Sequence, residues 1–181
     1  MIKFLKLLSR SIWVKIRTTK TRMRGVYRGL AEVFPNAPAD AQDVLAMTLW
    51  GECRSESDEG RRAVASVIYN RAQWNGNLNL FMRGITPLEA PTLRGRIKAV
   101  CLAKSQFSCW KWKIFTQESP YACNQWTDCI MLSKVVLGGC WSPTVSSVYY
   151  HADYIKAPSW TKDLEVECKI GKHIFYKISK V

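Results

Sequence analysis

The fold is decided by the stretch Leu49-Trp50-Gly51-Glu52-Cys53-Arg54-Ser55-Glu56, which closes the first helix that the sequence predicts. This helix is expected to run from about residue 41 to residue 54, with Asp40 as its N-cap. A polar break follows it, so the last turn of the helix carries Glu52 to the edge of the apolar core.

One face of this helix is apolar up to its last turn. Its members follow the spacing i, i+4, i+7 and i+11 and are Ala41, Leu45, Thr48 and Glu52. We expect this face to point inward. Partial desolvation and the negative end of the helix dipole then favour the protonated form of Glu52. That form suits a general acid in glycosidic bond cleavage. A surface glutamate is the competing interpretation, and spacing alone favours it.

The rest of the chain predicts helices first and strands afterwards. Three more helices are expected, at residues 59–72 with Asp58 as the cap, at 93–104, and from Ser119-Pro120 to Leu137, ending at Gly138-Gly139. Residues 73–92 are expected to be irregular. The β-prone segments are residues 145–150, 164–170 and 173–178, the last two joined by a tight turn at Gly171-Lys172. This order indicates the α+β class.

The net charge of +13 is concentrated near the start of the chain. Residues 1–30 contain no acid and nine basic residues: Lys3, Lys6, Arg10, Lys15, Arg17, Lys20, Arg22, Arg24 and Arg28. Residues 1–38 are therefore predicted to be a basic amphipathic tail and linker, and residues 39–181 the folded domain. The tail's apolar spacing favours contact with an anionic membrane or lipopolysaccharide. A disordered basic arm and a helix that docks on a partner are the alternatives. Lysines interrupt the apolar stretch, so no secretory signal is expected.

The seven cysteines include no CxxC pair, so neither a zinc ribbon nor a thioredoxin-like site is indicated. Buried thiols in a protein made in a reducing cytosol are favoured over a disulfide framework. No metal and no cofactor are expected.

Four separated motifs carry a resemblance to a known family. The first is the opening stretch at residues 49–56, continued by Glu59-Gly60, Ala63-Val64-Ala65 and Asn70-Arg71. The others are Gln106-Phe107-Ser108-Cys109-Trp110, Tyr149-Tyr150-His151-Ala152 and Ile170-Gly171-Lys172-His173-Ile174-Phe175-Tyr176. In this order, over about residues 40–178, they resemble the spore-cortex-lytic (SleB-like) cell-wall hydrolase family.

The resemblance implies a lysozyme-like helical domain with a small C-terminal antiparallel β-sheet. It also implies cleavage of the β-1,4 bond between N-acetylmuramic acid and N-acetylglucosamine in peptidoglycan, with Glu52 as the catalytic residue and Glu56 as a second candidate. Departures from the family pattern are Cys53 for Ala, Ser55 for Gly and Lys172 for Asn. None removes a catalytic group, but Ser55 puts the turn that positions Glu56 in doubt.

The matching motifs also favour a set of substrate-binding residues: Gln106, Phe107, Ser108, Trp110, Tyr150 and His151. For Gln106 and Ser108 the alternative is backbone capping in a loop, and for Trp110 it is a place in the core. The interpretation favoured for His173 is a structural role in the closing strand.

Two reaction routes stay open at this point. A lytic transglycosylase needs only Glu52, which protonates the glycosidic oxygen and then takes the proton of the attacking C6 hydroxyl. Hydrolysis needs a second carboxylate, for which Glu56, Asp128 and Asp153 are candidates. We favour the one-carboxylate route.

Other classes of function compete with a glycosidase. One is a cysteine-dependent wall amidase or peptidase, with Cys109 or Cys53 as the nucleophile and His151 as the base. The other is a non-enzymatic module that binds the wall or nucleic acid through the tail, although the body has no nucleic-acid motif. The favoured setting is a bacteriophage endolysin held in the host cytoplasm until holin release, or a virion-associated lysin in contact with virion proteins. Either acts on peptidoglycan in the cell wall or periplasm.

Overall fold

The computed structural model describes residues 40–76, 80–82, 90–103, 105–110 and 124–178. The predicted tail and linker at residues 1–38, and the helix start predicted at Ser119-Pro120, lie outside these ranges. Within them, no helix is long and apolar enough to span a membrane.

Helix α2, Ala41–Cys53, forms the centre of the helical part of the domain. Every residue from Val44 to Trp50 is buried, so the helix is covered on all sides and not on one face only. The prediction of a single inward face was therefore too narrow. A helix that is apolar all round belongs inside a protein. The polar end of α2 is where this buried helix emerges from the core.

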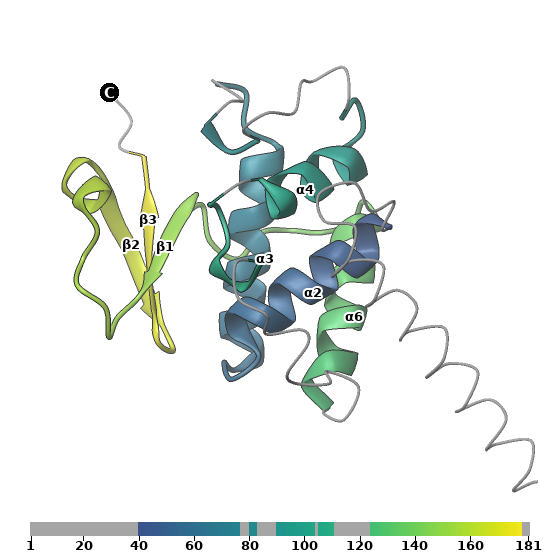
Figure 1. Ribbon diagram of the computed structural model, residues 1–181, viewed down its shortest axis with the longest axis horizontal. Helices are drawn as coiled ribbons and strands as arrows, with labels where there is room; N and C mark the ends of the chain where they lie inside the picture. The colour runs from purple at the N-terminus through teal and green to yellow at the C-terminus, as the bar shows by residue number, and fades with distance from the viewer. Residues whose placement is uncertain (1–39, 77–79, 83–89, 104, 111–123, 179–181) are drawn as a thin grey trace, which may run out of the picture. The chain divides into compact units, whose positions relative to one another are not determined.

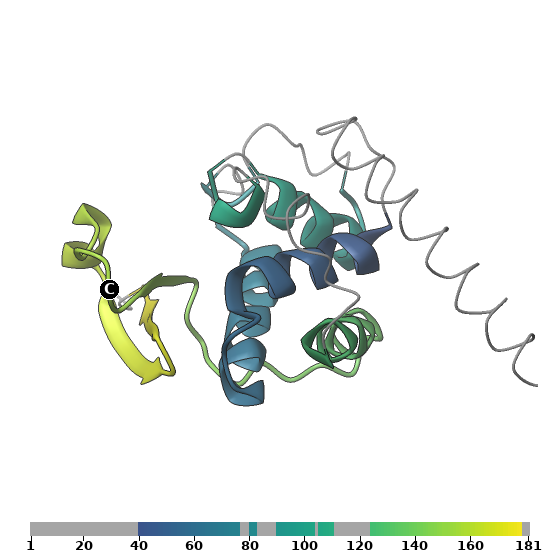
Figure 2. The same ribbon diagram turned by 60° about the horizontal axis from the view of Figure 1, so that its bottom comes forward.

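Three helices surround α2: α3 (Asp58–Ala72), α4 (Leu93–Leu102) and α6 (Asn124–Leu137). Figures 1 and 2 show them gathered around α2 on one side of the sheet. Helix α3 begins one residue before its predicted start, and α4 ends at Leu102 and not at residue 104. Helix α6 ends at Leu137 as predicted, whereas its predicted start lies outside the described residues. Gly139, just beyond α6, has a φ of +84°, the left-handed conformation that favours glycine after a helix end.

The N-terminal caps differ from the predictions in detail. The cap of α3 is Ser57, whose Oγ accepts a hydrogen bond from Gly60 N–H at 3.2 Å, so the prediction of Asp58 as the cap was wrong. Asp58 is the first residue of the helix and pairs with Arg62. Asp40 does occupy the N-cap position of α2, but its carboxylate pairs with Arg94 instead of capping the helix.

The C-terminal part of the chain forms an antiparallel sheet in the order β1-β3-β2. Its strands are β1 (Tyr149–Ala152), β2 (Glu165–Ile170) and β3 (His173–Lys177), with a register shift in β2 between Val166 and Cys168. The predicted turn joins β2 and β3 at Gly171, where φ is +55°. Together the helices and sheet confirm the α+β class.

The sheet is tied to the helices by the end of α3. Asn70 Nδ2 donates to the carbonyl oxygens of Val145 and Ser147 at 2.9 and 3.0 Å. Arg71 Nε donates to the carbonyl of Val148 at 2.7 Å. These bonds hold the strand that begins at Tyr149 beside the helices, and the candidate site lies at this junction.

Candidate functional site

A cleft separates the end of α2 from the strand β1 and the segment that follows it. Its lining residues are Gly51, Glu52, Arg71, Leu80, Ser105, Gln106, Ser108, Tyr149, Tyr150, His151, Ala152, Tyr154, Ile155, Pro158, Trp160 and His173. The cleft has a volume of about 780 Å³. Ligand sites are typically about 300–1,000 Å³, so there is room for a ligand of several rings.

The Glu52 carboxylate is held in the cleft by three hydrogen-bond donors. Its Oε1 accepts from Cys109 N–H at 2.8 Å and from the Ser108 hydroxyl at 3.3 Å. Its Oε2 accepts from the Tyr150 hydroxyl at 3.1 Å. The two oxygens differ because the shorter bond to Oε1 comes from a backbone N–H, which can only donate, whereas the bond to Oε2 comes from a hydroxyl, which can donate or accept.

The donors to Oε1 come from the short 3-10 helix η2, Ser108–Trp110. Ser105 has a φ of +68°, a conformation that side-chain-bearing residues rarely adopt, and it turns the chain between α4 and η2. Trp110 Nε1 donates to Thr48 Oγ1 at 3.2 Å, which fixes η2 to the buried part of α2. Glu52 and the two donors to its Oε1 are thus held by α2 and η2, which contact one another.

The donor to Oε2 is Tyr150, a half-buried tyrosine of β1. Burial, and next the negative charge of Glu52, raise the pKa of Tyr150 well above its ordinary value. The hydroxyl therefore keeps its proton at neutral pH. The ring of Tyr150 packs edge to face against His173, with centroids 5.1 Å apart, and also against Phe175.

Four of the six predicted substrate-binding residues line the cleft: Gln106, Ser108, Tyr150 and His151. Of these, His151 is buried with both ring nitrogens engaged, Nδ1 with the Ala152 carbonyl at 2.8 Å and Nε2 with the Tyr176 hydroxyl at 2.9 Å. Gln106 Oε1 accepts from Arg71 at 3.2 Å.

The other two predicted residues, Phe107 and Trp110, do not line the cleft. Phe107 is buried under the Arg71 guanidinium, 5.3 Å from its ring centroid. Trp110 is the residue that bonds Thr48. Both side chains support the residues that line the cleft, and neither is among its lining residues.

Glu56 lies outside the cleft lining, in contrast to Glu52. It is only 8% exposed, and its Oε2 accepts a hydrogen bond from Lys172 N–H at 3.1 Å, in the turn between β2 and β3. A side chain on Gly171 would collide with this carboxylate. Glu56 thus joins the start of α3 to the hairpin.

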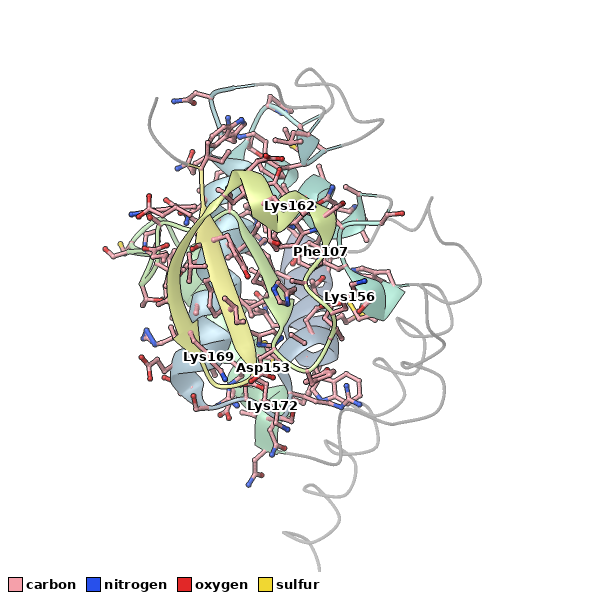
Figure 3. All side chains as sticks on the ribbon, turned by 90° about the vertical axis from the view of Figure 1, so that its left-hand side faces the viewer. Phe107, Asp153, Lys156, Lys162, Lys169 and Lys172 are labelled. Atoms are coloured by element: carbon pink, nitrogen blue, oxygen red, sulfur yellow. The ribbon has the colours of Figure 1, made fainter. Side chains whose placement is uncertain are left out.

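The other two carboxylate candidates are also engaged away from the cleft lining. Asp128 pairs with Arg61 at 3.2 Å. Asp153 pairs with Lys169 at 2.7 Å, and Figure 3 labels these two residues with Lys172 at one end of the sheet. Among the residues that the structure describes, Glu52 is the one carboxylate that lines the cleft.

Several lining residues escaped the sequence-based prediction. Arg71 belongs to a quoted motif but carried no predicted role, and His173 was interpreted as structural. Tyr154, Ile155, Pro158 and Trp160 lie in a stretch that matched no quoted motif. Apolar and aromatic residues in an otherwise polar connection were the signal that could have indicated them.

The thiols near Glu52 are poor nucleophiles. Burial, followed by neighbouring negative groups, raises the pKa of Cys53 and of Cys109 well above the ordinary thiol value. Burial also raises the pKa of Cys101 to about 12. In the described ranges all cysteines are free, and no cluster of His, Cys, Asp or Glu could hold a metal ion.

A family model described as Cell Wall Hydrolase matches residues 55–176. The match covers most of the domain but begins after Glu52. The assignment of Glu52 as a site residue therefore depends on its hydrogen bonds in the cleft and on the motif at residues 49–56. No curated protein matches the chain.

Two solved structures are similar to this chain. One is the catalytic domain of the Bacillus cereus SleB protein, 24% identical, covering 76% of this chain and 89% of that chain with a TM-score of 0.49. The other is the catalytic domain of the germination-specific lytic transglycosylase SleB from Bacillus anthracis, 24% identical, covering 79% and 99% with a TM-score of 0.50. At this identity the second likeness supports the fold alone.

Proposed function

Because the chain belongs to the cell wall hydrolase family, we propose that it is a peptidoglycan-degrading glycosidase with Glu52 as its catalytic acid. The observation that carries the proposal is the environment of Glu52. One carboxylate, held by three donors from two different parts of the fold, faces a cleft large enough for a glycan segment. The bond cleaved is the β-1,4 bond between N-acetylmuramic acid and N-acetylglucosamine.

We propose the lytic transglycosylase route for this cleavage. Protonated Glu52 donates its proton to the glycosidic oxygen as the bond from C1 of N-acetylmuramic acid to that oxygen breaks, which releases the 4-hydroxyl of N-acetylglucosamine. The Glu52 carboxylate then takes the proton of the C6 hydroxyl as that oxygen attacks C1. The products are a 1,6-anhydro sugar and a regenerated acid, with no water consumed.

The cleft favours this route over hydrolysis. Hydrolysis needs a second carboxylate about 5–9.5 Å from the first, to attack C1 or to activate water. In the part of the chain that the structure describes, Glu52 is the one carboxylate in the cleft lining, and Glu56, Asp128 and Asp153 are engaged elsewhere. A mechanism that uses one carboxylate twice matches this arrangement.

The reacting oxygen of Glu52 is proposed to be Oε2. The Tyr150 hydroxyl beside it donates when Glu52 is ionised and can accept when Glu52 is protonated. Oε1 remains fixed by Cys109 N–H in both states. The side chain can thus change its protonation twice per cycle without losing its orientation.

The test is digestion of purified sacculi by the wild-type chain and by Glu52→Gln, followed by mass spectrometry of the soluble products. We expect anhydromuropeptides from the wild type and none from Glu52→Gln, with both proteins giving the same circular dichroism spectrum. Products with reducing ends would replace transglycosylation by hydrolysis. Full activity of Glu52→Gln would overturn the assignment of the acid.

A cysteine-dependent amidase or peptidase has less support. The thiols of Cys53 and Cys109 are buried, with pKa values raised above the ordinary thiol value, so little thiolate forms. Both nitrogens of His151, the proposed base, are already hydrogen bonded. Thiol alkylation of the wild type is therefore expected to leave wall lysis intact.

For the biological setting we propose a phage lysin, free or virion-associated, whose basic residues 1–38 contact an anionic envelope surface. The support is the charge of this segment, nine basic residues and no acid in residues 1–30. Replacing Lys3, Lys6, Arg10 and Lys15 by Gln is expected to weaken binding of the full chain to lipopolysaccharide vesicles and to leave digestion of purified sacculi unchanged. Unchanged vesicle binding would leave the non-enzymatic role of the tail without support.

A further inference from the structure

The two walls of the cleft differ in chemistry. The wall that carries Glu52 is polar and also contains Gly51, Ser105, Gln106 and Ser108. The opposite wall comes from one continuous segment, residues 149–160, and is aromatic and apolar for most of its length. Its outer part, Tyr154 to Trp160, follows β1 and has no role in the proposed chemistry at Glu52. We call this outer part the aromatic wall.

Tyr154 and Ile155 expose apolar surface to the cleft. Tyr154 is 77% exposed and Ile155 is 47% exposed, although both are large hydrophobic residues. Among the described residues, the other exposed large hydrophobics (Met131, Val135, Val166 and Ile178) do not line the cleft. Two adjacent apolar side chains that stay in solvent within a ligand cleft indicate a surface that a ligand covers.

Trp160 gives the aromatic wall a rigid base. Its ring lies 5.2 Å from the ring of Tyr149, 5.5 Å from that of Tyr176 and 5.9 Å from that of His151, measured between centroids. Trp160 lies in a 3-10 helix, Ser159–Asp163, which begins directly after Pro158, and Pro158 also lines the cleft. The platform is therefore formed before a ligand binds, and little ordering of Trp160 is needed on binding.

The occupant that fits this wall is a pyranose ring. A sugar ring presents C–H groups on its faces and hydroxyls at its edge, so a flat aromatic ring packs on the face while polar groups bind the edge. Tyrosine combines an apolar ring with a polar hydroxyl at its tip. A continuous glycan strand whose scissile bond lies at Glu52 has further sugars along the same cleft.

We propose that the aromatic wall is a sugar-binding subsite, in which Tyr154 stacks on a pyranose ring of the glycan strand beside the fixed ring of Trp160. The inference rests on the proposed function, because it takes the glycan as the occupant of the cleft. Tyr154 is then a residue that sets affinity for the glycan, and Glu52 alone sets the chemistry.

The test measures binding of a peptide-free tetrasaccharide of alternating N-acetylglucosamine and N-acetylmuramic acid by isothermal titration calorimetry. All proteins carry Glu52→Gln so that the ligand is not consumed. We expect Tyr154→Ala to weaken the affinity about tenfold and Tyr154→Phe to retain most of it, because the ring and not the hydroxyl makes the stack. Met131→Ala, which removes a 55% exposed apolar side chain outside the cleft lining, is the matched control and is expected to bind like its parent.

Equal affinity of Tyr154→Ala and its parent overturns the inference and leaves the role of Glu52 standing. A parent that binds no tetrasaccharide also overturns it. Cleavage of the tetrasaccharide by Glu52→Gln has a different meaning, because it contradicts the proposed function. In that case the KM for the tetrasaccharide is compared between the parent and Tyr154→Ala. A tenfold rise in KM for Tyr154→Ala still supports the sugar-binding role of Tyr154.

Discussion

The Tyr150 hydroxyl donates a 3.1 Å hydrogen bond to Oε2 of Glu52, from a position 98 residues later in the chain. This bond joins the last turn of α2 to the first strand of the sheet, so the candidate acid is assembled only when both parts of the fold are in place. Tyr150 is half-buried and kept neutral by its raised pKa, and the rings of His173 and Phe175 hold it in position.

Tyr150→Phe is expected to lower the rate of sacculus digestion about tenfold, since it removes one hydrogen bond to the reacting carboxylate. The ring packing is retained, so the melting temperature should change little. The measurement is the initial rate of turbidity loss, with Tyr69→Phe as a control because its hydroxyl accepts an exposed hydrogen bond from Gln73 Nε2 and is not among the residues that line the cleft. A rate equal to wild type would mean that Tyr150 does not position Glu52.

Glu56→Gln is expected to retain digestion of sacculi within about twofold, because the amide oxygen can still accept the hydrogen bond from Lys172 N–H. Glu56→Ala is expected to lower the free energy of unfolding by about 1–3 kcal/mol, since it removes a buried acceptor. Urea unfolding and activity are measured on the same samples. A hundredfold loss of activity in a stable Glu56→Gln protein would contradict this view and restore Glu56 as a second catalytic carboxylate.

The sequence predicted the order of elements well because helical spacing, glycine stops and β-prone segments are local signals, although the cap of α3 was assigned one residue too late. The central place of α2 was missed because only the face of Ala41, Leu45, Thr48 and Glu52 was expected to point inward, although Val44 and every residue from Ala46 to Trp50 are also buried. Thr48 is buried, as its place on the inward face predicted, and its hydroxyl donates to the carbonyl of Val44. This hydrogen bond within the helix satisfies the hydroxyl, so a polar residue can lie inside the core.

The candidate site was predictable only in part. Glu52, Ser108 and Tyr150 were selected through motifs, but their hydrogen bonds join residues that are 56 and 98 positions apart. No periodicity reports such contacts. The interpretation of Phe107 as a substrate contact did not anticipate that it lies outside the cleft lining, whereas for Trp110 a place in the core was the open alternative. An aromatic residue suits a core and a sugar platform equally well. The positions of Tyr154 and Trp160 in the cleft depend on how the segment after β1 folds, and short motifs do not describe this.

Arg71→Met is expected to lower the free energy of unfolding by about 3 kcal/mol, because it removes buried hydrogen bonds to the Val148 carbonyl and to Gln106. It also removes a guanidinium packed over Phe81, Phe107 and Tyr149. Chemical denaturation measures the change. Arg94→Met is the control, since it breaks an exposed pair with Asp40 and should cost less than about 1 kcal/mol. Equal effects of the two substitutions would show that the Arg71 contacts do not hold the sheet to α3.

His173 should make the stability of the fold depend on pH. Burial lowers its pKa below the ordinary value of 6.5, and the negative charges of Glu56, Glu52 and Asp153 offset this only in part. As the pH falls below the ordinary pKa of histidine, His173 takes up a proton in the unfolded chain before it does so in the folded chain. The free energy of unfolding that is present above this pH is therefore reduced as the pH falls through the folded-state pKa. In the described part of the chain His173 Nδ1 has no hydrogen-bond partner, and its ring packs edge to face on Tyr150.

The substitution His173→Phe keeps a ring at this position and removes the titrating group. We therefore expect the melting temperature of His173→Phe to fall less than that of the wild type between about pH 7.5 and pH 5, measured by scanning calorimetry in buffers of equal ionic strength. Parallel pH profiles of the two proteins would exclude His173 as the source of acid sensitivity.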